Sequence, residues 1–229
     1  MADADATESA STLPPMEPIW PPALAVFVFI VITLVLRIAV PQRQSVGPHW
    51  LIPVLEMILL VVLLIAHQAG IDQRRPQVRQ LSIVLIVALL LAGFGSTVTL
   101  ISELITGSKV TQSADSLLAS GALVWLGNAL VFGLFYWQLD SGGPHVRRLA
   151  KRPYPDLGFP QHMNPELAPP DWRPEYPDYF ALGMYTSMAF SPTDVMPLAR
   201  WAKLAMTVQS LISVTVIGLV IARAVNVFQ

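Results

Sequence analysis

The sequence predicts an all-α protein, a polytopic transmembrane helical bundle with five long spans and one short or re-entrant helix. Hydrophobic residues make up 54% of the chain and charged residues 13%, with a mean hydropathy of +0.56, whereas roughly a quarter of the residues of a soluble domain are charged. Five apolar runs are long enough as helices to cross a hydrocarbon core of about 30 Å. A shorter apolar run, Asp178 to Phe190, ends at the polar break Ser191-Pro192-Thr193-Asp194.

Charge and composition exclude several classes of function. The formal net charge is -1, so the chain has no basic footprint for nucleic acid. It contains no cysteine, which rules out disulfide bonds and thiolate metal sites. The sequence also lacks His-Glu-x-x-His, Gly-x-Ser-x-Gly and paired intramembrane aspartates. It therefore predicts no enzyme, no catalytic residue, no metal site and no cofactor.

The chain divides into four parts. Residues 1–19 form an acidic tail without Lys or Arg, which we expect to be disordered because it holds little apolar surface. Residues 20–139 carry four spans, residues 140–177 a basic cluster and a proline-rich arm, and residues 178–229 the short helix and the last span. The long spans are expected at Pro22 to Val40, Trp50 to Ala69, Leu81 to Ser102, Leu117 to Leu139 and Leu198 to Phe228.

Local signals support the individual spans. Trp20 and Trp50 stand where the first two spans begin, and tryptophan suits the membrane interface. The third span is dense in small residues from Ala92 to Thr99, which lets another helix approach closely. The fourth contains Asn128 near its middle. We interpret Asn128 as an interhelical hydrogen-bonding residue, with the lining of a conduit as the alternative.

Two charged residues fall inside the first two predicted spans. Arg37 lies one turn before the end of the first span, and Glu56 lies roughly 9 Å inside the start of the second. An unpaired charge at that depth costs on the order of 3 kcal/mol or more. Both residues approach the same hairpin turn, so we favour a structural ion pair between them. An ion or proton site at Glu56 is the alternative.

A proline-rich arm follows the fourth span and its basic cluster. Eight prolines from Pro153 to Pro177 are expected to exclude regular helix and central strand, leaving an extended interfacial or cytoplasmic segment. Trp172, Tyr176 and Tyr179 are expected at the headgroup level. The basic cluster comprises Arg147, Arg148, Lys151 and Arg152.

The arginines set the predicted topology. Arg74, Arg75 and Arg79 are separated from the basic cluster by two spans, so both groups share a side, which the positive-inside rule makes cytoplasmic. The amino terminus is then cytoplasmic too, in a bacterial-type inner membrane. We expect the short helix to cross by borrowing Ser191 to Val195, which puts the carboxyl terminus in the cytoplasm. In the alternative the short helix is re-entrant and the last span ends outside.

The last third of the chain carries the candidate pathway. Several polar residues of the last span, together with Gln209, fall within less than half a turn at 100° per residue and form a polar stripe. Such a stripe lines water or bonds a neighbouring helix, and unwound backbone at membrane depth is tolerated only against protein or water. The candidate pore-lining or ion-pathway residues are Thr186, Ser187, Ser191, Thr193, Asp194, Lys203, Thr207, Ser210 and Ser213.

Five short motifs carry a family resemblance. They are WQLDSGGP at Trp137 to Pro144, FPQ at Phe159 to Gln161, WRP at Trp172 to Pro174, AFSPTD at Ala189 to Asp194 and ARAVN at Ala222 to Asn226. These motifs resemble those of a widespread family of uncharacterised bacterial membrane proteins of about this length. The resemblance implies a polytopic inner-membrane protein and no particular activity.

The order of elements in the last third is also similar to the pore module of two-helix potassium channels. Tyr179-Phe180 lead the short helix, Thr186 to Ser191 occupies the filter position, Asp194 follows and the last span stands where the inner helix would be. A potassium filter needs glycines so that its carbonyl groups line the pore. This chain has none at that position, so the likeness does not imply potassium selectivity.

The sequence therefore predicts a protein of the lipid bilayer with channel-like or transporter-like passage of a small ion. A channel with one pore helix per chain needs symmetric partners around an axis, so this function implies a homo-oligomer. The alternative function is a non-transporting membrane scaffold that docks a partner through the proline-rich arm.

Overall fold

Four helices in the computed structural model are long and apolar enough to cross a membrane. They are α2 (Trp20–Ala39), α4 (Pro76–Thr106), α5 (Ala114–Leu139) and α9 (Arg200–Val227). The structure describes residues 17–39, 50–68, 76–106, 113–149, 154–192 and 194–227. The predicted all-α class and the membrane-spanning helices are confirmed in this part of the chain. Thr193, the tail up to residue 16, and the cations Arg74, Arg75, Lys151 and Arg152 lie outside the described residues.

The fifth predicted span corresponds to α3 (Leu51–Gln68). Its backbone is helical over 18 residues, and the apolar stretch found among its described side chains is Leu51–Val62. Four of the five predicted long spans are therefore confirmed, and the described side chains do not test the fifth over its full length.

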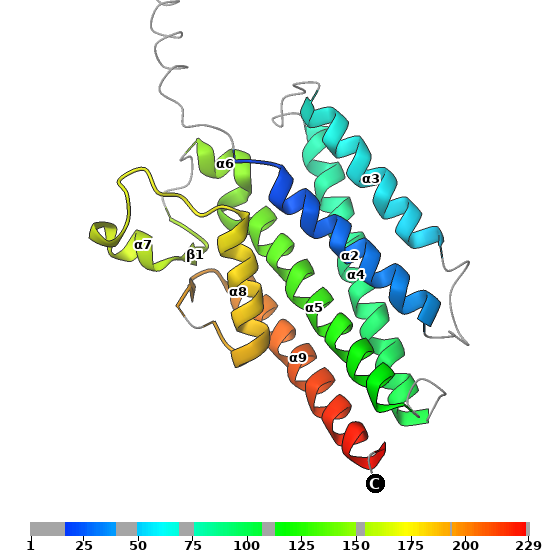
Figure 1. The fold of residues 1–229 in the computed structure, drawn as a ribbon. Coiled ribbons are helices and arrows are strands. Elements are labelled where there is room, and N and C mark those ends of the chain that lie inside the picture. Colours follow the sequence, from blue (N-terminus) through cyan, green and yellow to red (C-terminus); the bar gives the residue numbers. More distant parts are fainter. Residues whose placement is uncertain are drawn as a thin grey trace, which may run out of the picture.

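α5 lies at the centre of the bundle, with α2, α4, α8 (Tyr176–Ala189) and α9 around it (Figure 1). α3 packs at the edge, against α2 and α4. Glycine allows the closest helix contact of α5. A Cβ atom at Gly133 of α5 would lie 3.1 Å from the Cα atom of Phe180, so the backbones of α5 and α8 nearly touch.

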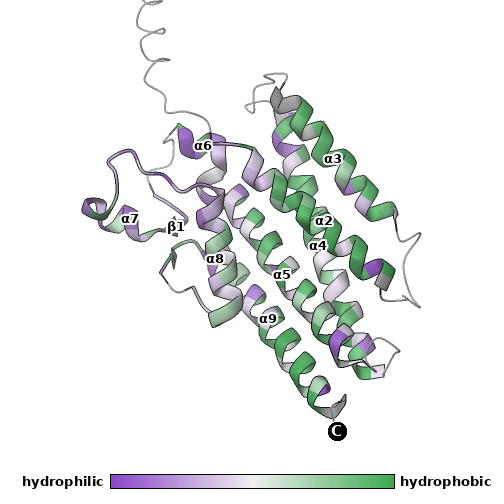
Figure 2. Ribbon diagram, in the orientation of Figure 1, coloured by the Kyte–Doolittle hydropathy of each residue, from purple (hydrophilic) through white to green (hydrophobic). Residues whose placement is uncertain are grey.

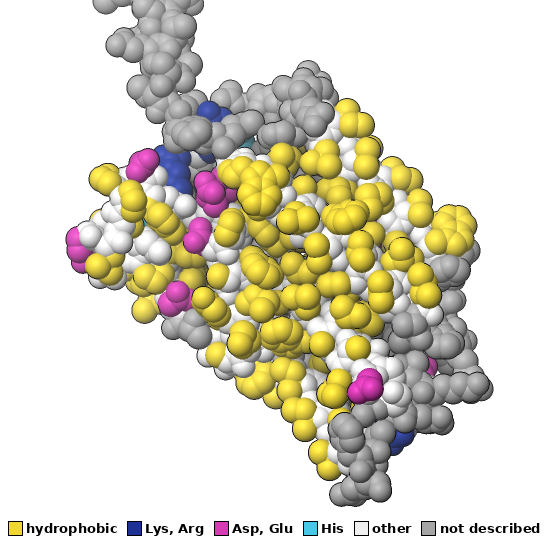
Figure 3. Space-filling view, viewed as in Figure 1, with side chains coloured by type: hydrophobic (Ala, Val, Ile, Leu, Met, Phe, Trp, Pro, Cys, Tyr) yellow, Lys and Arg dark blue, Asp and Glu magenta, His cyan; other side chains and the backbone are white. Residues whose placement is uncertain are grey.

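The outer surface of the bundle is apolar along its length and charged toward its ends. The long helices are mostly hydrophobic (Figure 2). On the face drawn in Figure 3, hydrophobic side chains form a broad continuous area, and charged groups gather near α6 and α7 and at the opposite end. An apolar band between two charged ends is what a bilayer and its two interfaces require.

α8 and α9 run in the same direction, both antiparallel to α5. Tyr179 at the start of α8 bonds Asp140 at the end of α5, whereas Ser187 near the end of α8 accepts from Trp125, deeper in α5. α9 likewise bonds Tyr136 before it reaches Asn128, through Gln209 and then Ser213. α8 and α9 therefore both begin at the same end of the bundle (Figure 1).

Residues 190–199, which we call the return segment, connect the carboxyl end of α8 to the start of α9. β2 (Met196–Pro197) pairs antiparallel with β1 (Leu157–Gly158), and the Leu198 N–H donates to the Asp156 carbonyl at 2.9 Å. The expected crossing of the short helix is therefore wrong, because this pairing holds the start of α9 beside the arm. The re-entrant alternative matches the observed path, and α9 ends at the far end of the bundle.

The arm is folded rather than extended. After η2 (Asp140–Gly142) and α6 (Pro144–Arg148) it forms β1, α7 (Pro160–Met163) and η3 (Pro165–Leu167). The prediction that the prolines from Pro153 to Pro177 exclude helix is wrong for α7 and η3, because Pro160 and Pro165 occupy first-turn positions, where the missing N–H has no helical partner to lose. Leu157 and Phe159 are buried against the bundle.

Candidate functional site

A buried network of polar side chains joins α5, α8 and α9 near the middle of the bundle. We call it the Gln209 cluster, and it comprises Asn128, Tyr136, Ser187, Gln209 and Ser213. The Gln209 side chain is fully buried; its Nε2 donates to the Gly183 carbonyl at 2.7 Å and to Ser187 Oγ at 2.9 Å. Tyr136 Oη donates to Gln209 Oε1 at 2.6 Å. Every polar atom of the Gln209 side chain is therefore satisfied without water.

Asn128 extends the Gln209 cluster toward the far end of the bundle. Its Nδ2 donates to Ser213 Oγ at 2.9 Å and to the Gln209 carbonyl at 3.4 Å. This matches the interpretation of Asn128 as an interhelical hydrogen-bonding residue. Bonds of this kind between membrane helices contribute about 0.5–2 kcal/mol each, so the cluster fixes the register of α8 and α9 on α5.

The structure separates the predicted pathway residues into two groups. Ser187 and Ser213 are fully buried members of the Gln209 cluster, and Thr186 is also fully buried, with no hydrogen-bond partner for its hydroxyl among the described residues. Ser210 is half-buried beside them. The remaining described residues form an exposed group on the outside of the chain, namely Ser191, Asp194, Lys203 and Thr207.

The exposed group lies on the return segment and the first two turns of α9, which we call the α8–α9 outer face. α8 ends at Ala189, and the left-handed backbone of the next residue, Phe190 (φ 57°), turns the chain out of the helix. Thr207 donates to the Lys203 carbonyl at 2.9 Å, and Ser191 to the Ala189 carbonyl at 3.5 Å. The predicted stripe on the last span is therefore divided, with Gln209 and Ser213 facing α5 and Lys203 and Thr207 facing outward.

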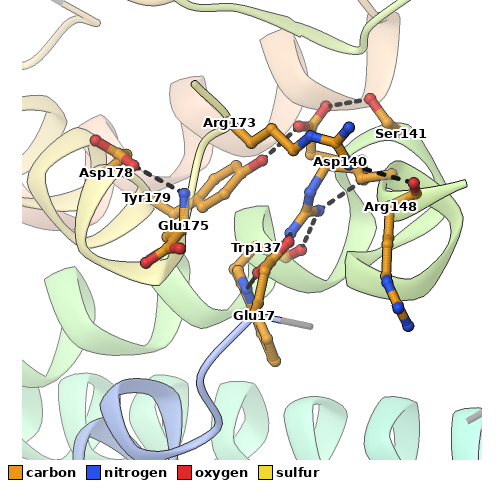
Figure 4. Close-up of polar contacts among 10 residues, drawn as sticks. Glu17, Trp137, Asp140, Ser141, Arg148, Arg173, Glu175, Asp178 and Tyr179 are labelled. Atoms are coloured by element: carbon orange, nitrogen blue, oxygen red, sulfur yellow. Dashed lines mark hydrogen bonds and ion pairs between the residues drawn. The ribbon is translucent and has the colours of Figure 1, made fainter. Parts of the chain in front are cut away.

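A second polar cluster lies where α5, α6 and α8 meet, and sequence analysis missed it. The carboxylate of Asp140, 1% exposed, accepts from Tyr179 Oη at 2.6 Å, Ser141 Oγ at 3.1 Å and the Leu157 N–H at 3.2 Å. These bonds join the end of α5 to α8 and β1 (Figure 4). Tyr179 is consequently buried inside the protein, and its ring is not exposed to lipid headgroups. The sequence signal that could have indicated this cluster is Asp140, which follows the aromatic end of the fourth span, Phe135-Tyr136-Trp137.

Arg147 of α6 ties the residues before α2 to this same cluster. Its guanidinium donates to the carbonyls of Trp137 and Asp140 at 2.7 and 2.9 Å and pairs with Glu17 at 3.0 Å. Trp137 Nε1 also donates to Glu17, at 2.7 Å (Figure 4). Burial raises the pKa of the Glu17 carboxyl above its ordinary value of 4.5, and the nearby Arg147 opposes that rise. The end of the acidic tail is thus ordered.

Glu56 is fully buried, and neither of its carboxylate oxygens has a hydrogen-bond partner among the described residues. Arg37 acts on it electrostatically, but no ion pair within 4.0 Å forms between their described atoms. The favoured ion pair is therefore not formed. Among the described residues, the buried Glu56 carboxylate therefore has no direct partner.

The described residues contain no group of three or more His, Asp or Glu side chains placed to hold a metal ion. What the arrangement offers is a rigid polar core and an exposed polar face beside it. Comparison of the chain with family models, with curated proteins and with solved structures finds no match.

Proposed function

We propose that this membrane protein passes a small ion, in a channel-like or transporter-like manner, along the α8–α9 outer face. The observation that carries the proposal is the exposed, non-helical return segment. Phe190, Ser191 and Asp194 are all exposed there. Non-helical backbone exposed to hydrocarbon is not tolerated, because its N–H and C=O groups have no partner in lipid.

The return segment begins deep in the bundle, where exposed non-helical backbone would face the centre of the bilayer. Ser187, in the last turn of α8, accepts from Trp125, which lies eleven positions after the first residue of the 26-residue helix α5. The segment therefore leaves α8 near the middle of a spanning helix. In a bilayer, that position needs water or another protein surface.

The side chains around this point are suited to a hydrated path. Asp194 supplies a negative charge, Lys203 and Arg200 supply positive charges, and Ser191 and Thr207 supply hydroxyl groups in the same segment and turns. Charges at membrane depth are costly and mark ion pathways when they face water. Because the face lies outside a single chain, sealing it from lipid requires several copies around an axis. A homo-oligomer is therefore part of the proposal.

The scaffold remains the second candidate because the arm presents apolar side chains to solvent. Tyr154 is 82% exposed and Leu167 is 72% exposed, and both lie on the segment that would dock a partner. A scaffold needs neither ion flux nor a symmetric oligomer.

Ion flux into liposomes that contain the purified protein separates the two candidates. We expect flux of at least one common cation or anion above that of empty vesicles, and a several-fold loss in Asp194→Ala and Ser191→Ala. Asp115→Ala and Ser102→Ala are matched controls, since both residues are exposed at the far end of the bundle, and they should retain the wild-type flux. Flux equal to that of empty vesicles for all ions tested would overturn the proposal and leave the scaffold.

The absence of native cysteine permits a second test by thiol labelling. A charged, membrane-impermeant thiol reagent should modify Ser191→Cys and Thr207→Cys in proteoliposomes. Val54→Cys, exposed on the apolar face of α3, should stay unmodified because it faces lipid. If Thr207→Cys is as unreactive as Val54→Cys, the outer face is dry and the pathway does not exist.

A further inference from the structure

A cavity of about 540 Å³ lies between α2, α3, α4, α5 and α6, at the end of the bundle that holds the arm. It shares no lining residue with the α8–α9 outer face. Its volume falls within the range of about 300–1,000 Å³ that is usual for small-molecule sites. The sequence analysis gives no signal for it, because its walls come from five separate segments.

The polarity of the cavity changes along the axis of the bundle. Arg79 lies near the start of α4, and Ile86 lies seven residues further along, about 10 Å deeper into the bundle. His145 of α6 lines the same outer end as Arg79, together with Gln138 and the turn before α6. The deeper walls are apolar and are formed by Val26, Leu60, Leu85, Ile86 and Leu134.

The charged side chain in the described lining is a cation. Arg79 and His145 are in the wall, and no Asp or Glu stands among the described lining residues. Arg148 lies on the same short helix as His145, whereas Arg147 of that helix is paired with Glu17. A deep apolar slot below a cationic rim complements an amphiphile with an acyl chain and an anionic head. Basic pockets between membrane helices bind the headgroups of anionic lipids in this way.

We propose that this cavity holds an anionic phospholipid of the surrounding bilayer. One acyl chain occupies the apolar slot between α2, α4 and α5, and the phosphodiester is held by the Arg79 guanidinium and the His145 ring. A guanidinium recognises phosphate through two parallel N–H donors. The site joins α2 and α4 to α5, so a bound lipid contributes to the packing of the first half of the bundle on the central helix. This inference is independent of ion passage.

Binding can be measured on the delipidated protein in a neutral detergent by native mass spectrometry and thermal unfolding. The probes are a phosphatidylglycerol, a phosphatidylcholine with the same chains, and inorganic phosphate. We expect the phosphatidylglycerol to be retained and to raise Tm, with an apparent affinity at least tenfold higher than that of the phosphatidylcholine. Equal binding of the two lipids would overturn the proposal. A Tm shift with inorganic phosphate equal to that with phosphatidylglycerol would also overturn it, because the site would then bind an anion without an acyl chain.

Two variants localise the lipid. Arg79→Gln should abolish the preference for phosphatidylglycerol, whereas Arg173→Gln is the matched control, because Arg173 lies on the arm, outside the cavity, and bonds the Arg148 carbonyl at 3.2 Å. A preference unchanged in Arg79→Gln would contradict the assignment.

Fluorescence quenching tests the position of the acyl chain directly. A phosphatidylglycerol with a brominated chain should quench Trp137, which lines the cavity. The quenched fraction should therefore fall in Trp137→Phe. Quenching that is identical in wild type and Trp137→Phe would place the chain elsewhere on the bundle.

Discussion

At the scale of single residues, buried polar side chains in the described part of the chain are of two kinds, those with hydrogen-bond partners and those without. Gln209 and Asp140 are buried, and short bonds join Gln209 to α5 and α8 and Asp140 to α8. Glu56 and Thr186 are equally buried and have no hydrogen-bond partner among the described residues. A buried polar group without a partner costs about 1–3 kcal/mol. Gln209 and Asp140 therefore help to specify the fold, whereas Glu56 and Thr186 destabilise it.

Gln209→Leu should destabilise the protein by about 2–4 kcal/mol. The substitution removes the acceptor of Tyr136 and the donor to Gly183 and Ser187, and each buried group left without a partner costs about 1–3 kcal/mol. Thermal or denaturant unfolding in detergent would measure the change. Ser210 follows Gln209 in the chain and is half-buried. As a control, Ser210→Ala should change stability by about 0.5 kcal/mol or less.

Glu17 should make the stability of the protein depend on pH in the acid range. Its pKa in the folded state is raised above 4.5 by burial, so the folded state keeps this proton where the unfolded state has lost it. As the pH rises from below 4.5 through the raised pKa, the contribution of Glu17 to stability therefore falls. Unfolding of Glu17→Gln across this range should lack that decrease. Glu103→Gln should retain it, and identical slopes in wild type and Glu17→Gln would contradict the assignment.

At the scale of elements, α8 is positioned by local sequence at its start and by glycine along its length. Glu175 and Asp178 form a capping box that fixes the first turn. Further along, a Cβ atom at Gly183 would lie 2.6 Å from the Ala129 carbonyl oxygen and 3.2 Å from the Gly133 nitrogen. The α5–α8 contact is thus made backbone to backbone, with no space for a side chain.

Gly183→Ala should therefore push α8 off α5. Overpacking of this kind costs about 1–3 kcal/mol, and displacement of α8 should also lengthen the Gln209 to Gly183 bond. Gly95→Ala is the matched control, because a Cβ there meets nothing within 4 Å. An alanine in that exposed helical position should be neutral or stabilising by up to about 1 kcal/mol. Comparison of Tm for the two variants tests the contact; equal values would contradict it.

At the scale of the whole molecule, the pairing of β1 with β2 decides which end of the bundle α9 starts from. Two strands of two residues each, with Leu157 opposite Pro197 and Gly158 opposite Met196, fold the return segment back to the arm. The parallel course of α8 and α9 follows from this pairing. The arm and the carboxyl end of α9 consequently lie at opposite ends of the bundle (Figure 1).

Labelling from each side of the membrane should report this arrangement. A single cysteine at Glu166→Cys, exposed on the arm, and a single cysteine added after Gln229 should react with an impermeant thiol reagent from opposite faces of sealed vesicles. Reaction of both from the same face would mean that α8 crosses the membrane after all. Asp171→Cys, also exposed on the arm, is the control and should follow Glu166→Cys.

The sequence by itself determined the class of the protein and the position of most of its helices. Apolar runs of spanning length and a low content of charge leave a membrane bundle as the only way to bury so much apolar surface. The polar break at Ser191 and Pro192 also predicted where α8 ends. These features are local, so composition and helical length suffice to predict them.

Only the tertiary structure decided which polar residues meet. Asn128, Gln209 and Ser187 are more than twenty residues apart in the chain, and their partnership depends on the direction of α8 relative to α9. That direction is set by a strand pair too short to leave a sequence signal. The same dependence separated Gln209 and Ser213, inside the bundle, from Lys203 and Thr207, outside it, because the side of a helix that faces its neighbour is fixed by packing and not by the helix itself.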